Sequence, residues 1–165
     1  MERPLTARVR ADGEAVTLAE YERAGGYRGL RRALQESPAD IGATVREANL
    51  RGRGGAGFNT GLKWSFVPLG PDAPHPKYVV CNADEMEPGT FKDRLLLEAD
   101  PHQLIEGLAI AAWAIEADVA YIFLRGEYTD AAARLERALA EAYAAGYLGP
   151  DVLKSGWRLE MYLHL

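Results

Sequence analysis

Three short apolar runs in the second half of the chain predict β-strands. Residues 78–81 and 119–124 are rich in β-branched and aromatic side chains, a composition that is typical of buried strands. Residues 158–165 alternate instead, with leucines and a methionine on one face and mostly polar residues on the other. That run predicts a strand with one face buried and the other either wet or reserved for another group.

Apolar spacing and capping signals predict three short helices in the first third of the chain. Thr17 and Glu20 have the spacing of a capping box, which places a helix start near residue 17. Residues 27–35 predict a second short helix. Ser37 followed by Pro38 has the pattern of an N-cap and a first helical residue, so a third helix is expected to begin there.

Two longer helices are expected between and after the first two strands. One begins at Asp100 and Pro101 and carries apolar residues at helical spacing. His102, in its first turn, is expected to be exposed. The other is expected to be capped by Thr129 and to end at Gly146, because glycine commonly follows the last turn of a helix.

The order of these elements predicts an α/β fold. Strand, helix, strand, helix and strand alternate after residue 77, which is the pattern of an α/β sandwich. The segment 1–50 is expected to form a helical N-terminal subdomain, and 51–165 the α/β domain. Because the chain stops within the last strand, we expect this domain to be truncated at its C-terminal end.

A glycine-rich stretch at residues 50–61 is the most unusual part of the sequence. Its glycines can turn backbone N–H groups toward an anion, and Arg51, Arg53 and Lys63 place positive charge around them. Thr60 has the character of an N-cap, so a helix start would also point at the stretch. These features predict a phosphate cradle rather than a flexible surface loop. The stretch lacks the Gly-Lys-Ser/Thr of a Walker A loop, and its Gly-x-Gly-x-x-Gly spacing follows a helix instead of a strand.

An acidic turn, residues 82–89, directly follows the first predicted strand. Ligands of open α/β sheets bind beyond the carboxyl ends of strands, so this turn is a second candidate site. Asn82, Asp84, Glu85 and Glu87 suit a magnesium or calcium ion, the hydrogen-bond donors of an organic ligand, or no more than a solvated turn. The residues alone leave these three interpretations open.

The composition is that of an ordinary globular protein and argues against several functions. Of 165 residues, 48% are apolar and 26% are charged, and a net charge of −5 disfavours nucleic acid or an anionic membrane as the main partner. Cys81 is the only cysteine, so the chain forms neither an internal disulfide nor an all-protein iron–sulfur site. No stretch reaches the roughly 20 apolar residues of a transmembrane helix, which argues against direct membrane insertion.

Four motifs of this sequence resemble one protein family. Leu-Arg-Gly-Arg-Gly-Gly-Ala-Gly-Phe-x-Thr-Gly-Leu-Lys-Trp occupies residues 50–64, and Cys-Asn-Ala-Asp-Glu-x-Glu-Pro-Gly-Thr-Phe-Lys-Asp-Arg occupies residues 81–94. Pro-His-x-Leu-Ile-Glu-Gly begins at Pro101, and Arg-Gly-Glu-Tyr begins at Arg125. Together they are similar to the NADH-binding flavoprotein subunit of respiratory complex I, known as the 51 kDa subunit. Diaphorase subunits of NAD-linked hydrogenases and formate dehydrogenases share this module.

The resemblance implies a Rossmann-like α/β sandwich with a helical N-terminal subdomain. It also implies an NADH dehydrogenase, in which FMN takes hydride from NADH and passes electrons to iron–sulfur clusters. No residue is then expected to act as a catalytic acid or base, no metal is expected in the acidic turn, and a [4Fe–4S] cluster is expected only in a further C-terminal part. The residues implied at FMN are Gly52, Arg53, Gly54, Lys63, Asn82, Asp84 and Glu85. The residues implied at NADH are Phe58, Phe66 and Glu87.

The resemblance also implies partners and a location. These are NADH, the iron–sulfur subunits of a multisubunit oxidoreductase, and a cytoplasmic position peripheral to the inner face of the membrane. Asn59, where proline is usual, and Met86, where a small residue is common, depart from the family pattern without removing a ligand. A diaphorase subunit, a non-catalytic flavin- or nucleotide-binding remnant and a structural assembly module stay open as alternatives, and the physiological electron acceptor stays undecided.

Overall fold

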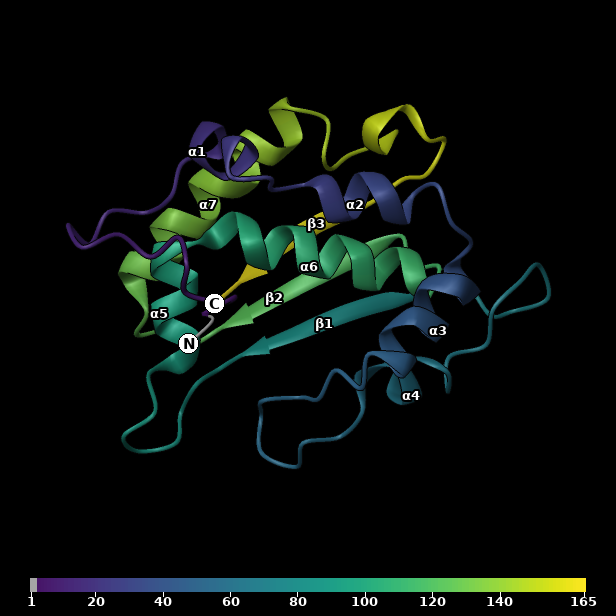
Figure 1. Ribbon diagram of the computed structural model, residues 1–165, viewed down its shortest axis with the longest axis horizontal. Helices are drawn as coiled ribbons and strands as arrows, with labels where there is room; N and C mark the ends of the chain where they lie inside the picture. Colours follow the sequence, from purple (N-terminus) through teal and green to yellow (C-terminus); the bar gives the residue numbers. More distant parts are fainter. Residues whose placement is uncertain (1–2) are drawn as a thin grey trace.

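The computed structural model describes residues 3–165, and its centre is a three-stranded parallel sheet (Figure 1). The strands are β1 (Tyr78–Ala83), β2 (Val119–Leu124) and β3 (Glu160–His164). They lie in the order β1-β2-β3, and β2 pairs in parallel with both neighbours. The three predicted strands and the α/β class are therefore confirmed, and the carboxyl ends of all three strands lie at one edge of the sheet.

Helices cover one face of this sheet (Figure 1). The connection from β1 to β2 contains α5 (Lys92–Ala99) and α6 (Pro101–Ala114), and the connection from β2 to β3 contains α7 (Thr129–Ala144) and the short 3₁₀ helix η1 (Val152–Lys154). The alanine, isoleucine and leucine side chains of β2 that face these helices are buried in the main core. Within residues 3–165, no helix is both long and apolar enough to cross a membrane.

The opposite face of the sheet is bare in the part of the chain that the structure describes. Exposed apolar and aromatic side chains run across all three strands there: Tyr78, Val80, Tyr121, Phe123 and Tyr162. The rings of Tyr121 and Tyr162 stack with centroids 5.5 Å apart. The prediction of buried strands at 78–81 and 119–124 is thus wrong for this face, because an apolar run does not reveal whether one face or both are covered.

The N-terminal helices pack on the outer side of α6 and α7. They are α1 (Leu18–Arg23), α2 (Arg28–Ala33) and α3 (Pro38–Glu47), and α4 (Thr60–Trp64) follows the glycine-rich stretch. Tyr21, Tyr27 and Leu30 share one hydrophobic core with the sheet. The subdomain boundary at residue 50 stays a prediction, and residues 1–2 of the predicted segment lie outside the described residues.

A buried polar cluster joins these N-terminal helices to α6. The carboxylate of Glu106 accepts the backbone N–H groups of Tyr27 and Leu30 at 2.9 and 3.0 Å, and it also bonds to the hydroxyl of Tyr21. The ring of His102 lies between the hydroxyl of Tyr27 and the carboxylate of Glu141, at 3.0 Å from each. The expectation that His102 is exposed is wrong, because α1 and α2 cover the first turn of α6.

The helix starts show which local signals were reliable. The capping box of Thr17 and the N-cap at Ser37 are confirmed, since both side chains accept the backbone N–H three residues on. Thr129 is wrong as a cap, because it is the first helical residue of α7 and Tyr128 occupies the N-cap position without a side-chain bond to the helix. The tyrosine hydroxyl bonds to Glu85 instead. Helix α5 has no counterpart among the predicted elements.

Candidate functional site

The glycine loop, residues 52–58, is closed at its neck by two backbone hydrogen bonds. The N–H of Gly52 donates to the carbonyl of Phe58 at 2.9 Å, and the N–H of Thr60 donates to the carbonyl of Leu50 at 2.8 Å. Residues on the two sides of the neck thereby form an antiparallel bridge. The neck fixes where the loop begins and ends, while its tip is left to exposed glycines and one arginine.

Asn59, rather than Thr60, caps helix α4 after the loop. Its Oδ1 accepts the N–H of Leu62 at 2.8 Å, and its Nδ2 donates to Asn49 Oδ1 at 3.1 Å and to the carbonyl of Arg46 at 3.3 Å. The predicted cap at Thr60 is wrong because Thr60 is already helical, whereas Asn59 has the extended backbone of an N-cap. The start of α4 is thus capped by its own chain, and a helix terminus adds nothing to the predicted cradle.

Close packing between α4 and α3 depends on Gly61. A Cβ atom at this position would lie 2.3 Å from the backbone nitrogen of Arg46 and 2.5 Å from its Cα, closer than side chains approach backbone. The two helices therefore touch through backbone. Because α4 carries Lys63, this contact also sets how far that ammonium group stands from the glycine loop.

Cations and aromatic rings surround the loop without protein partners of opposite charge. Arg53 and Lys63 are exposed, and neither has a carboxylate within 4.0 Å in the described part of the chain. Phe58 and Phe66 are also exposed, and their ring centroids are 6.3 Å apart. Unpaired cations beside glycine N–H groups suit an anion, and two adjacent exposed rings suit a planar ligand group.

The acidic turn follows β1 as predicted, but its carboxylates have different surroundings. The side chain of Asn82 accepts the N–H of Asp84 at 3.0 Å, which bends the chain away from the strand. Glu85 is buried, with 7% exposure. Its carboxylate accepts the N–H groups of Asp93 and Arg94, both at 3.0 Å, and so caps the first turn of α5.

The surroundings of Glu85 keep its carboxylate ionised. Burial alone would raise the pKa of this group, but the two backbone N–H groups of α5, the hydroxyl of Tyr128 and the ammonium of Lys92 at 4.0 Å together hold it below the usual value of 4.5. At neutral pH, Glu85 is therefore a buried anion that its own chain has already paired.

Two residues of the loop after β2 also hold the acidic turn. Nη1 of Arg125 donates to the carbonyl of Glu85 at 2.8 Å, and the hydroxyl of Tyr128 reaches the same carbonyl at 3.3 Å and the carboxylate at 3.2 Å. Sequence reasoning gave neither residue a role. The signal was present, since both follow a strand that lies parallel to β1 and ends at the same edge.

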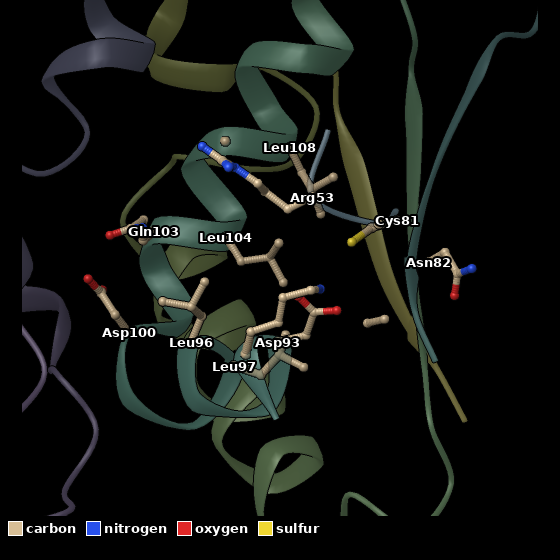
Figure 2. Close-up of a pocket in the computed structure, with 14 residues that line it drawn as sticks. Arg53, Cys81, Asn82, Asp93, Leu96, Leu97, Asp100, Gln103, Leu104 and Leu108 are labelled. Atoms are coloured by element: carbon tan, nitrogen blue, oxygen red, sulfur yellow. The ribbon is translucent and has the colours of Figure 1, made fainter. Parts of the chain in front are cut away.

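The glycine loop and the acidic turn meet at the carboxyl end of β1 around two adjoining cavities. One has a volume of about 440 Å³ and is lined by the loop and the turn. The other, about 400 Å³, lies between β1 and helices α5 and α6, with leucines on the helical side and the thiol of Cys81 on the strand side (Figure 2). Five residues line both cavities: Arg53, Gly54, Asn82, Lys92 and Asp93.

Most of the predicted site residues are brought together here. Arg53, Gly54, Asn82, Asp84, Glu85 and Glu87 line the 440 Å³ cavity. Gly52, Phe58 and Lys63 line a third cavity of about 530 Å³ on the other side of the same loop. Phe66 lines none of these three cavities and contacts the site only through the ring of Phe58. Among residues 3–165, no three metal-ligating side chains gather closely enough to hold a metal ion.

Gly54 shows that the site fits a ligand that approaches the backbone. It lines all three cavities, and a Cβ atom built on it would meet no atom within 4 Å. Its φ is not in the left-handed region, so neither packing nor backbone strain requires glycine there. What the missing side chain leaves is open space at the wall of the cavity, next to the unpaired cation of Arg53.

Comparison with known proteins gives consistent relatives. The Nuo51 FMN-binding domain family matches residues 45–164. The chain is 59% identical over 148 residues to an F-type NADH-quinone oxidoreductase subunit of Rhizobium meliloti, covering 89% of this chain and 35% of the relative. It is 52% identical over 162 residues to the F-type NADH-quinone oxidoreductase subunit of Escherichia coli, covering 98% of this chain and 36% of the relative.

A solved structure supports the same relationship. The crystal structure of an NAD⁺-reducing [NiFe]-hydrogenase in the H₂-reduced state contains a chain similar to this one, with a TM-score of 0.70 and 35% identity. The match covers 93% of this chain and 25% of that chain. The chain also spans only about a third of the length of the two NADH-quinone oxidoreductase relatives. It belongs to the family of the Nuo51 FMN-binding domain, found in the 51 kDa subunit of complex I.

Proposed function

We propose that this chain is the FMN- and NADH-binding part of the flavoprotein subunit of an NADH:quinone oxidoreductase. The observation that carries the proposal is the meeting of the glycine loop and the acidic turn around adjoining cavities. A phosphate needs N–H donors and cations, which the loop offers, and a polyol chain needs acceptors, which the turn offers. The names of the NADH-quinone oxidoreductase relatives support the same assignment.

Residues on both sides of the cavities receive roles at FMN. The phosphate is assigned to the backbone of Gly52 and Gly54 and to the cations of Arg53 and Lys63. The ribityl chain and the flavin ring are assigned to Asn82, Asp84 and the turn that contains Glu85. The unpaired state of the two cations and the open space at Gly54 support these roles.

NADH is assigned to the exposed residues at the rim of the same site. Phe58 and Phe66 offer adjacent ring faces for the adenine, and aromatic stacking of this kind needs no specific hydrogen bonds. Glu87 is exposed on the acidic turn and is assigned to the nicotinamide nucleotide. The dinucleotide would then extend from the mouth of the 440 Å³ cavity toward the glycine loop.

The protein supplies position and electrostatics in this function rather than an acid or a base. When bound, FMN accepts the hydride of NADH and gives up the two electrons singly to one-electron acceptors. The glycine loop would neutralise the phosphate charge, and the turn would orient the ring so that the nicotinamide can lie against it. No proton transfer by a side chain is needed, which agrees with the absence of an assigned catalytic residue.

The remaining assignments concern the complete protein. We infer that a longer chain carries the [4Fe–4S] cluster, and that partner subunits carry further clusters toward the acceptor. The subunit would be cytoplasmic and peripheral to the inner face of the membrane through those partners. A diaphorase role is the second candidate function, favoured by the similarity to a chain of an NAD⁺-reducing [NiFe]-hydrogenase.

A titration of the purified 165-residue chain with FMN tests the proposal. We expect flavin fluorescence to be quenched to a one-to-one end point, and NADH then to bleach the flavin absorbance under anaerobic conditions. Flavin binding without bleaching would support a remnant without turnover. No flavin binding would support an assembly module, or a site that needs more of the protein, and would contradict the proposal for this chain.

A further inference from the structure

Every polar atom of Glu85 beyond its own N–H is already bonded within the protein. The two carboxylate oxygens accept the N–H groups of Asp93 and Arg94, and one of them also accepts the hydroxyl of Tyr128. The carbonyl oxygen accepts Arg125 and Tyr128. A side chain with 7% exposure and this set of partners has little left to offer a ligand.

The neighbours of Glu85 on the acidic turn differ in this respect. Asp84 and Glu87 line the same cavity, and in residues 3–165 their carboxylates have no hydrogen-bond or ion-pair partner. Glu87 is fully on the surface side of the turn. The turn thus alternates between one carboxylate fixed in the protein and flanking carboxylates directed toward the site.

The partners of Glu85 come from the next strand and from the helix after the turn. Ala83 and Leu124 are opposite each other at the ends of β1 and β2, so Arg125 lies directly beside the start of the turn. Nε of Arg125 is itself held by the carboxylate of Glu127 at 3.1 Å. The contact therefore joins three segments that are far apart in the sequence.

We propose that Glu85, Tyr128 and Arg125 form a lock that positions the acidic turn, and that Glu85 acts on a bound ligand only through this lock. The lock holds the turn against α5 and β2 so that Asn82, Asp84 and Glu87 stay aimed at the cavity. All three residues are positioning residues and none is a ligand. The consequence for FMN rests on the proposed function, whereas the lock itself does not.

Amide hydrogen exchange on the ligand-free chain tests the lock without any flavin. The variants are Glu85→Gln, which places an amide N–H₂ where a carboxylate accepted, and Tyr128→Phe, which removes one hydroxyl. Both are expected to speed exchange at the amides of Asp93 and Arg94 by roughly tenfold, since the hydrogen bonds that protect them are weakened. Exchange in β2 and in the middle of α7 is expected to stay unchanged.

A double-mutant cycle then decides how Glu85 acts on FMN affinity. If the glutamate works through the lock, Tyr128→Phe weakens FMN binding about fivefold alone and adds almost nothing in the Glu85→Gln background. A residue that touched the flavin itself would give additive losses. Tyr162→Phe and Glu136→Gln, two exposed side chains away from the turn, are matched controls expected to change neither readout.

The outcomes separate this proposal from the proposed function. Unchanged exchange at residues 93 and 94 in both variants, or additive losses of FMN affinity, would overturn the lock. Faster exchange at these amides together with no FMN binding by the wild-type chain would support the lock and contradict the proposed function for this chain. Faster exchange with non-additive losses supports both.

Discussion

The glycine loop and the acidic turn line the same cavity but are held in opposite ways. The loop is fixed only at its neck by two backbone hydrogen bonds, and its cations have no partners in the described chain. The turn is fixed at its centre by a buried glutamate with partners from α5 and from the loop after β2. One wall of the site is therefore open to a ligand's charge, and the other is set before any ligand arrives.

This difference indicates how the two walls divide the work of binding. A loop with unpaired cations gains its partners when an anion binds, so its shape and the ligand are expected to depend on each other. A turn that its own chain already pairs needs no reorganisation, which keeps its acceptors in place at no added entropy cost. Changes in the loop should therefore act on affinity, and changes in the turn on orientation.

Reversing the charge of Lys63 should have the largest effect on binding. Lys63→Glu removes a cation beside the loop and adds an anion, so FMN should not survive gel filtration with the chain, a loss of roughly 10- to 100-fold in affinity. Lys154→Glu, the same change in the distant 3₁₀ helix, is the control. Equal flavin content in the Lys63→Glu and wild-type chains would remove the phosphate from this loop.

Filling the contact at Gly61 should have the largest effect on stability. A methyl group would overlap the backbone of Arg46, so Gly61→Ala should lower the free energy of unfolding by about 2 kcal/mol and displace α4 with the loop. Gly42→Ala is the matched control, since a Cβ on that residue of α3 meets nothing within 4 Å. Equal urea midpoints for the two variants would show that α3 and α4 are not held by backbone contact.

Gly54→Ala should separate binding from folding. The added methyl group enters open space in the ligand-free chain, so the urea midpoint should change little, while FMN should bind about fivefold more weakly because the group occupies the cavity wall. Gly42→Ala again serves as the control and should leave FMN affinity unaltered. Unchanged affinity in the Gly54→Ala chain would place the flavin away from this residue.

A neutral residue at Glu87 should act on the nucleotide rather than on the flavin. Glu87→Gln keeps the size of the side chain and removes its charge, so NADH affinity is expected to change several-fold while FMN content stays near the wild-type value. Stopped-flow bleaching at varied NADH concentrations measures the first quantity, and flavin absorbance per chain measures the second. The reverse pattern would move Glu87 from the nucleotide to the flavin.

The smallest expected effect is the acid sensitivity that Glu85 confers. Its pKa is lower in the folded chain than the unfolded value near 4.5, so its ionised form stabilises the fold above that pH, and this share is lost as the pH falls through the folded value. Wild-type chain should therefore exceed Glu85→Gln in urea midpoint at pH 7, with a smaller difference at about pH 3. An equal difference at both values would show that the charge of Glu85 does not stabilise the fold.

The sequence was informative where the signal was local and uninformative where it was not. The bounds of β2 and the caps at Thr17 and Ser37 follow from residues within a few positions of each other. The partners of Glu85 lie up to 43 residues away, so no pattern within the turn could reveal them. The burial of His102 likewise depends on helices that precede it by about 75 residues.

The site itself divides along the same line. The motifs placed the glycine loop and the acidic turn on the two sides of one strand end, and the structure brings them around shared cavities. Periodicity could not say that one face of the sheet is bare, because the same apolar run fits a strand covered on one side or on both. The cap at Asn59 was missed because two adjacent residues were both suitable caps.

Gly54 and Gly61 predict two different records of tolerated change at what looks like the same residue. In a library that substitutes every position and is sorted only for folded chains, position 61 should accept almost nothing and position 54 should accept small side chains. Sorting the survivors a second time for retained flavin should then close position 54 as well. The glycines that selection fixes for folding could in this way be told apart, within one short stretch, from those that it fixes for a ligand.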